Sequence, residues 1–167
     1  PIFQDDPRTN VPVYVRIVRV YWKSAFAIGT MGFASGLVRS IAVADVQLGD
    51  VTNAASFLGL FVVAGLMLLL WQRRSFALNL HFVFMVSFPL VAVCLAFFPF
   101  VEGKTLAFIS GIVFLLFSLA NIIVMLQSAH ICLNRGCNPF FVYGFFGSIV
   151  GLLQNGGFIF GHIAVAN

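Results

Sequence analysis

The sequence predicts an all-α polytopic membrane protein, a bundle of five transmembrane helices, from three observations. Hydrophobic residues make up 61% of the 167 residues and charged residues only 8%, and the mean hydropathy is +1.06. A water-soluble domain needs about a quarter charged residues to cover its surface. The other two observations are a series of long apolar stretches and the short polar segments between them. The lipid bilayer is therefore the expected partner of most of the surface.

Each apolar stretch is long enough to cross a membrane, since a hydrocarbon core about 30 Å thick needs roughly 20 helical residues. The stretches are continuous apolar runs, whereas a membrane β-barrel requires alternation with period two. Short connections place consecutive helices antiparallel. The expected spans are residues 24–46, 53–71, 75–98, 105–127 and 139–166, joined by connections at 47–50, 72–74, 102–104 and 130–138.

Residues 1–23 form a lead-in to the first span. Its first dozen residues are polar and rich in proline, and Tyr21 and Trp22 mark its boundary with the span. Between them, three basic residues share one helical face and three apolar residues lie opposite. This pattern is typical of an amphipathic helix on a membrane surface; a solvated cationic linker is the alternative. The basic residues are Arg16, Arg19 and Lys23, and the apolar residues are Val13, Ile17 and Val20.

Positive charge alternates between the two ends of the predicted helices. Basic residues precede the first span and follow the second and the fourth, whereas the other connections are mainly acidic. By the positive-inside rule the start of the chain is cytoplasmic and Asn167 is on the outer side. A chain that begins with Pro1 and has an odd number of spans is expected to be part of a longer protein. The basic residues are Arg8, Arg16, Arg19, Lys23, Arg73, Arg74 and Arg135, and the other connections hold Asp45, Asp50, Glu102 and Lys104.

Glycines mark two helix faces that can approach a neighbouring backbone closely. Close packing of small residues drives helix association in lipid, and GxxxG pairs are frequent in any membrane bundle. Helix packing is the simpler interpretation of these faces, and the lining of a central cavity is the sharper one. The faces are Gly29, Gly32 and Gly36 in the first span, and Gly144, Gly147 and Gly151 in the fifth, continued by Gln154, Phe158 and Gly161.

Arg39 is the first candidate ligand-binding residue. It lies inside the first span, on the same face as Gly36. An arginine within a span costs at least about 2.5 kcal/mol, so it needs a partner or a route to water. One alternative is that its side chain extends to the outer interface near Asp45 and Asp50. The other is that it faces a cavity and holds an anionic group.

Three amide residues within the spans complete the candidate ligand-binding set. Gln154 and Asn155 lie in the middle of the fifth span, and Asn121 lies in the fourth. An unsatisfied amide is costly in lipid. Hydrogen bonds between helices are the simpler interpretation, also for His81 in the third span. Pro89 predicts a kink in that span.

Catalytic and cofactor motifs are not recognisable in the sequence. There is no glycine-rich phosphate loop, no paired carboxylates within a span and no Ser-His-Asp set, so we expect neither an enzyme nor a cofactor. His130, Cys132 and Cys137 lie close together, but their spacing matches no strong zinc pattern. We therefore expect no metal site.

The order of these features resembles the second half of a major facilitator superfamily bundle, its seventh to eleventh helices. A basic lead-in, a glycine-rich first helix, a short turn at 72–74, two further helices and a glycine-rich fifth helix follow one another. The resemblance implies that residues 1–23 belong to the loop joining the two halves, and that the missing half is a partner. Only Arg73 and Arg74 remain of the superfamily's loop motif, a departure from the pattern of ordinary transporters.

A closer resemblance is to the multi-helix membrane domain of bacterial LuxR-type regulators. It rests on residues 32–39 (GFASGLVR) and 134–139 (NRGCNP), and on the high phenylalanine content. In that family a facilitator-like bundle precedes a helix-turn-helix domain. The resemblance implies a multi-pass protein of the bacterial inner membrane, a small-molecule ligand, and contact with DNA only through a domain outside this sequence.

Two functions are consistent with these features. The first is a membrane-embedded sensor or anchor module of a LuxR-type transcriptional regulator. The second is part of one half of a facilitator-type secondary transporter for a small solute, with Arg39 and Gln154 in the binding site. A purely structural membrane subunit is a third possibility.

Overall fold

The computed structural model describes the backbone of residues 11–44, 46–72, 80–135 and 137–166. All regular structure in these ranges is helical, which confirms the prediction of an all-α chain. The elements are α1 (Val11–Ala44), α2 (Val46–Gln72), α3 (Leu80–Phe97), the 3-10 turn η1 (Phe98–Phe100), α4 (Lys104–Arg135) and α5 (Pro139–Ala166).

Three helices within the described ranges are long and apolar enough to cross a membrane. Their membrane-compatible segments are Val11–Ala44, Lys104–Ala129 and Pro139–Ala166, and a shorter apolar helix covers Phe84–Phe100. Helices of this kind are compatible with a protein embedded in a membrane. The third of these segments has the bounds predicted for the fifth span.

Helical structure extends into two of the predicted connections. Residues 47–50 belong to the first turns of α2, and α4 extends to Arg135, into the predicted connection at 130–138. Hydropathy marks where a helix leaves the apolar phase, whereas the backbone hydrogen-bond ladder continues until a cap or a breaker ends it. Gly103, with a φ of 61°, is such a breaker before α4.

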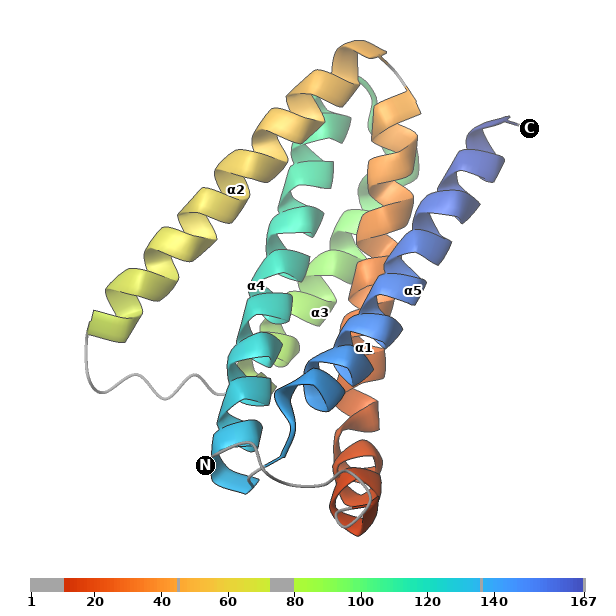
Figure 1. The fold of residues 1–167 in the computed structure, drawn as a ribbon. Coiled ribbons are helices and arrows are strands. Elements are labelled where there is room, and N and C mark those ends of the chain that lie inside the picture. Colours follow the sequence, from red (N-terminus) through yellow and green to blue (C-terminus); the bar gives the residue numbers. More distant parts are fainter. Residues whose placement is uncertain (1–10, 45, 73–79, 136, 167) are drawn as a thin grey trace.

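Figure 1 shows α1, α4 and α5 packed together, with α3 beside α1 and α4. The most extensive helix pairing is between α1 and α5. α2 meets α1 near their connection, then diverges from it and packs mainly against α4. The connection from α1 to α2 therefore lies at one end of the bundle, and the start of α1 at the other.

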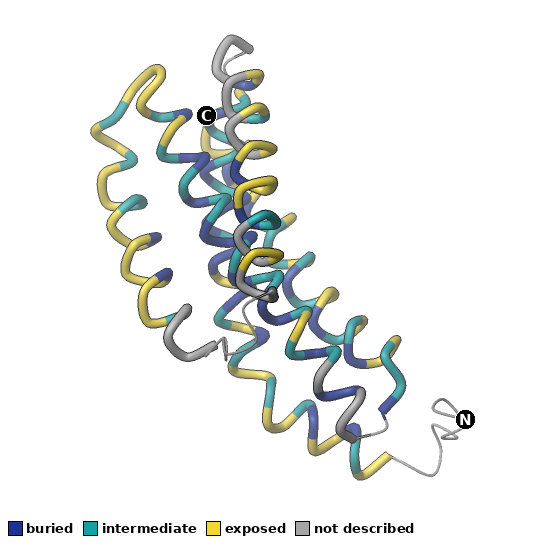
Figure 2. The backbone as a smooth tube through the Cα atoms, turned by 90° about the vertical axis from the view of Figure 1, so that its left-hand side faces the viewer, coloured by how far each residue is buried: buried dark blue, intermediate teal, exposed yellow. Residues whose placement is uncertain are grey.

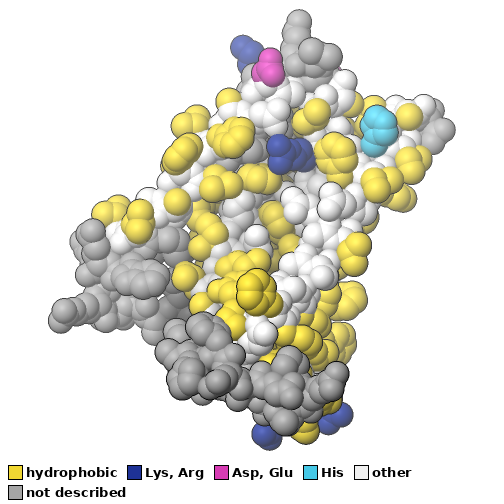
Figure 3. All heavy atoms as spheres, in the orientation of Figure 1, with side chains coloured by type: hydrophobic (Ala, Val, Ile, Leu, Met, Phe, Trp, Pro, Cys, Tyr) yellow, Lys and Arg dark blue, Asp and Glu magenta, His cyan; other side chains and the backbone are white. Residues whose placement is uncertain are grey.

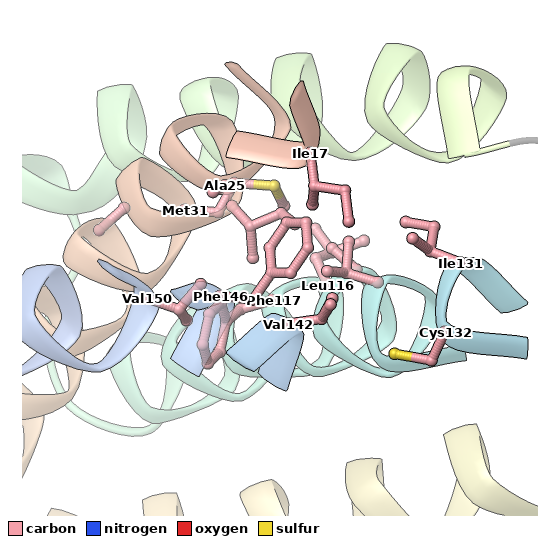
Figure 4. Packing of buried hydrophobic residues seen from close by; sticks show 14 of the residues in the cluster. Ile17, Ala25, Met31, Leu116, Phe117, Ile131, Cys132, Val142, Phe146 and Val150 are labelled. Carbon is pink, nitrogen blue, oxygen red and sulfur yellow. The ribbon is translucent and has the colours of Figure 1, made fainter. Parts of the chain in front are cut away.

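The hydrophobic core lies where α1, α4 and α5 converge. Ile17 and Met31 of α1, Phe117 of α4, and Val142 and Phe146 of α5 are all at most 4% exposed, and Figure 4 shows their side chains meeting. Buried residues follow the middle of the bundle in Figure 2, and exposed ones follow its outer sides. Burial of this apolar cluster against α1 fixes the place of both α4 and α5.

Residues 11–23 of the predicted lead-in are part of α1, which runs without interruption from Val11. Its apolar side packs against the bundle through Ile17, which is fully buried, and Tyr14, whose ring centroid lies 4.6 Å from that of Phe141. Val20, also on the predicted apolar side, is 54% exposed. This part of α1 therefore has one side packed against the bundle and another side exposed.

Several residues used in the sequence analysis lie outside the described part of the structure. Residues 1–10, Asp45, Arg73 and Arg74 belong to this group, as do the side chains of His81, His130 and Arg135. Pro89 is described and lies within α3, which continues through it.

Candidate functional site

A cavity of about 390 Å³ lies between α1, α2 and α5, beside the α1–α2 connection. Its volume falls within the range of small-molecule sites, about 300–1,000 Å³. Arg39 lies five residues before the end of α1, about 8 Å along a helix that rises 1.5 Å per residue. The cavity is lined by Gly36, Arg39 and Val43 of α1, Asn53 of α2, and Gln154, Asn155 and Phe158 of α5.

Glycine at position 36 allows this site to form. A Cβ atom on Gly36 would overlap the carbonyl oxygen of Gln154 and lie 3.0 Å from the backbone nitrogen of Phe158. Backbone contact between α1 and α5 at this level places Arg39, less than one turn further along α1, beside the amides of α5. The glycine face that predicted helix packing thus also forms one wall of a cavity.

The guanidinium of Arg39 contacts two side chains, one in α2 and one in α4. One of its terminal nitrogens donates a hydrogen bond to Oδ1 of Asn53 at 3.0 Å. Its central carbon lies 5.2 Å from the ring centroid of Phe114 in α4, within the range of a cation–π contact. Both partners are uncharged, and no ion pair joins Arg39 to a carboxylate in the described part of the chain. Half-buried Arg39 therefore has uncharged partners only, as far as the described residues go.

Gln154 and Asn155 are adjacent on α5 but differ in their hydrogen bonding. The amide nitrogen of Asn155 donates to the carbonyl oxygen of Gly151 at 2.8 Å, one turn earlier in the same helix. Gln154 is half-buried, and its side chain makes no hydrogen bond to any described residue. The Gln154 amide, with one donor group and one acceptor, is thus available to a bound molecule.

Asn121 does not reach this cavity. It lies in α4, half-buried, and its Oδ1 atom is buried without a hydrogen-bond partner among the described residues. The structure therefore brings together three of the four candidate residues, and places the fourth elsewhere in the bundle.

No group of three His, Cys, Asp or Glu residues that can hold a metal ion occurs among the described side chains. Cys132 and Cys137 are both buried, at the end of α4 and just before α5, and neither forms a disulfide. Burial raises the pKa of the Cys132 thiol, and neighbouring Cys137 raises it further. Both causes disfavour the thiolate that a metal site would require.

Sequence reasoning did not identify Asn53, Phe114 or Val43 as parts of this site. Asn53 carried the clearest signal, since an amide at the edge of an apolar stretch is a candidate partner for an arginine in the preceding helix. Phe114 is one of 21 phenylalanines, and nothing local distinguishes it from the others.

No protein-family model matches the chain, and neither curated proteins nor solved structures give a significant match.

Proposed function

We propose that this chain is a membrane-embedded ligand-binding module in which Arg39 holds the negatively charged end of a small organic molecule. The single observation that carries the proposal is the cavity, where a guanidinium that pairs with no carboxylate of the described residues lies among three amide and two apolar side chains. In a region of low dielectric such a guanidinium attracts a carboxylate or phosphate strongly, and can bind it through two parallel hydrogen bonds.

The membrane setting is supported by the apolar side chains on the outside of the bundle. Phe57, Phe61, Phe140 and Leu152 are 65%, 74%, 88% and 75% exposed, respectively. Hydrophobic side chains cover much of the face drawn in Figure 3, where cationic side chains lie near the two ends and at one place between them. Soluble monomers rarely expose contiguous apolar patches of more than a few hundred Å². We propose that all five long helices cross the bilayer.

The proposed orientation places the start of α1 on the cytoplasmic side of a bacterial inner membrane. Arg16, Arg19 and Lys23 are exposed near that end of α1. Asp50 and Glu102 are exposed at the opposite end, where α1 connects to α2 and where α4 begins. The asymmetry in basic residues supports this direction, which puts the Arg39 cavity in the outer half of the bilayer.

Within this setting we infer a sensor or anchor module of a LuxR-type transcriptional regulator. A ligand at Arg39 would contact α1, α2 and α5 together, and would favour the packing in which those helices are close. The output would pass to a helix-turn-helix domain elsewhere in the parent protein, and DNA would be contacted only there. The sequence resemblance and the reduced loop motif at 72–74 motivate this assignment.

The alternative is part of one half of a facilitator-type secondary transporter. Its support is the position of the cavity between helices of the bundle, where transporters place their substrates. Against it, proton coupling commonly uses a carboxylate inside a span. The second to fifth predicted spans contain no Asp or Glu, and the first contains only Asp45, next to its end. Uptake of a carboxylate into proteoliposomes, abolished by Arg39→Gln, would favour the transporter. A parent reading frame ending in a helix-turn-helix domain would favour the regulator.

The binding site itself is tested with matched pairs of neutral and anionic probes. The full chain in lipid nanodiscs is titrated with benzoate and benzamide, and with butyrate and butyramide, while thermal stability is monitored. We expect stabilisation by the carboxylates only, lost in Arg39→Gln and retained in Lys104→Gln, which removes an exposed cation outside the cavity. Equal responses to carboxylate and amide across both pairs would contradict the proposal.

A further inference from the structure

A second cavity lies at the other end of the molecule, between the first turns of α1 and the start of α5. It is an open groove of about 740 Å³ whose walls are apolar except at its edge. The groove is far from Arg39 along α1, and the ligand proposed for Arg39 does not use it. It is lined by Val11, Tyr14, Val15, Val18 and Arg19 of α1, and by Asn138 and Phe141.

The floor of the groove is held in place by contacts between α1 and α5. The rings of Tyr14 and Phe141 are in contact, and the backbone N–H of Asn138 donates to the Tyr14 hydroxyl at 3.4 Å. Oδ1 of Asn138 in turn accepts the N–H of Phe140 at 2.9 Å and caps the start of α5. The groove is thus a built feature of the packed helices.

The edge of the groove is positively charged. Arg19 lines it, and Arg16 and Lys23 lie within one turn of Arg19 on the same face of α1, all three exposed. The capped N-terminus of α5 beside the groove adds the partial positive charge of a helix dipole. An apolar channel with a cationic rim is complementary to a molecule with one long apolar part and one anionic part.

The length of α1 places this groove at the level of the lipid headgroups. α1 has 34 residues, which span about 50 Å at 1.5 Å per residue, against a hydrocarbon core of about 30 Å. Trp22, 46% exposed, follows Val18 by four residues and so lies about one turn further along nearly the same side of α1. Tryptophan in that position is typical of the membrane–water interface.

We propose that this groove binds an anionic phospholipid, with one acyl chain against Val11, Val15 and Val18 and the phosphate at Arg19. Val11 and Val15 are 53% and 52% exposed on the groove side, so an acyl chain covers apolar surface that the protein leaves open. A bound lipid of this kind holds the first turns of α1 at the cytoplasmic leaflet. It also supports the start of α5, which the groove residues position.

The experiment uses fluorescence of Trp22 in the full chain, in a Trp71→Phe background where Trp22 is the only tryptophan. The protein is reconstituted in vesicles of phosphatidylcholine with a fixed fraction of brominated phosphatidylglycerol, or of brominated phosphatidylcholine with identical chains. Bromine quenches tryptophan at short range. We expect phosphatidylglycerol to quench Trp22 with an apparent affinity about fivefold higher than phosphatidylcholine, the factor expected for one basic residue at a membrane surface.

Two pairs of variants separate a specific site from general attraction. Arg19→Gln is expected to remove the preference for phosphatidylglycerol, and Lys104→Gln to keep it. Val15→Gln makes the groove polar and is expected to weaken quenching, whereas Val20→Gln, at 54% exposure on another side of the same helix, leaves it unchanged. Equal quenching by both lipids in the parent protein overturns the proposal. The proposal is also overturned if Arg19→Gln and Lys104→Gln change the lipid preference equally, or if Val15→Gln and Val20→Gln change the quenching equally.

Discussion

At the scale of single residues, the environment of Arg39 explains how a guanidinium is accommodated inside an apolar bundle. The hydrogen bond to Asn53 and the ring of Phe114 offset part of the cost of removing Arg39 from water. Neither partner neutralises its charge. The chain can therefore fold with Arg39 inside the bundle, and the guanidinium is still able to bind an anion.

Replacement of Asn53 by alanine tests the structural part of this account. Asn53→Ala removes a hydrogen bond to a charged group, and we expect a loss of about 1.5–3 kcal/mol in the free energy of unfolding. The control is Asn155→Ala, because the Asn155 amide bonds, among the described residues, only to a carbonyl of its own helix, and we expect a change within about 0.5 kcal/mol. Unfolding by SDS titration in mixed micelles measures both. A loss no larger than in the control would show that Asn53 does not stabilise Arg39.

Arg39→Lys is not a conservative change at this site. Lysine keeps the charge but lacks the planar fork that binds a carboxylate through two bonds and stacks on Phe114. We expect carboxylate affinity to fall about tenfold, which is the loss of about one charge-assisted hydrogen bond. Calorimetric titration of the nanodisc-embedded protein with benzoate gives the affinity directly. Unchanged affinity would mean that charge alone attracts the ligand.

Cys132 provides a pH-dependent signal near the end of α4. Because burial and then Cys137 raise the pKa of its thiol, the thiolate fraction is lower than that of a free cysteine at any given pH. We expect the alkylation rate by iodoacetamide, followed by peptide mass spectrometry, to reach half its maximum at a higher pH than for free cysteine. Cys137→Ala removes the smaller cause and should shift the midpoint part of the way back. A midpoint at or below that of free cysteine would contradict the buried placement.

At the scale of helices, glycine decides how closely α1 and α5 approach. A Cβ atom on Gly157 would overlap the backbone of Phe33, and one on Gly161 would lie 2.8 Å from the carbonyl oxygen of Leu37. Gly144 and Gly147, on another side of α5, have open space around them. At the first end of the predicted face on α5, Gly144 and Gly147 therefore approach no described residue closely, whereas Gly161, at its other end, packs against α1.

Gly157→Ala and Gly147→Ala are a matched pair that tests the close approach of α1 and α5. The first forces two backbones apart, and we expect a loss of about 1–3 kcal/mol, the usual cost of overpacking. The second fills open space and favours the helix slightly, so we expect no loss. SDS unfolding again measures both variants. Comparable losses would show that the close approach of α1 and α5 is not what stabilises the bundle.

Element type and approximate position followed from the sequence because an apolar stretch of about 20 residues has few alternatives to a helix. The start of α2 could not be predicted in this way, because polar residues such as Gln47 and Asp50 are compatible both with a helix outside the hydrocarbon core and with a loop. The site was partly predictable: Arg39 and Gln154 each lie close in the helical repeat to a glycine face. Asn53 and Asn121 depend on how α2 and α4 are rotated and tilted, which apolar content does not determine.

At the scale of the whole molecule, the two ends of the bundle differ in charge and the surface between them is apolar. The starts of α1 and α5 and the end of α4 lie together, and the start of α4 lies at the other end with the α1–α2 connection. This arrangement agrees with alternating helices, and with exposed Lys23 on one side and exposed Asp50 and Glu102 on the other. Every site proposed above depends on this placement in a bilayer.

Side-specific labelling tests this placement most directly. Single cysteines at Lys23, Asp50 and Glu102 are introduced into a variant without Cys94, Cys132 and Cys137, and intact cells are treated with a membrane-impermeant maleimide. We predict labelling of the cysteines at Asp50 and Glu102 from outside, and of the cysteine at Lys23 only after the membrane is opened. Labelling of the Lys23 and Glu102 positions from the same side, or recovery of the chain in the soluble fraction without detergent, would contradict the account.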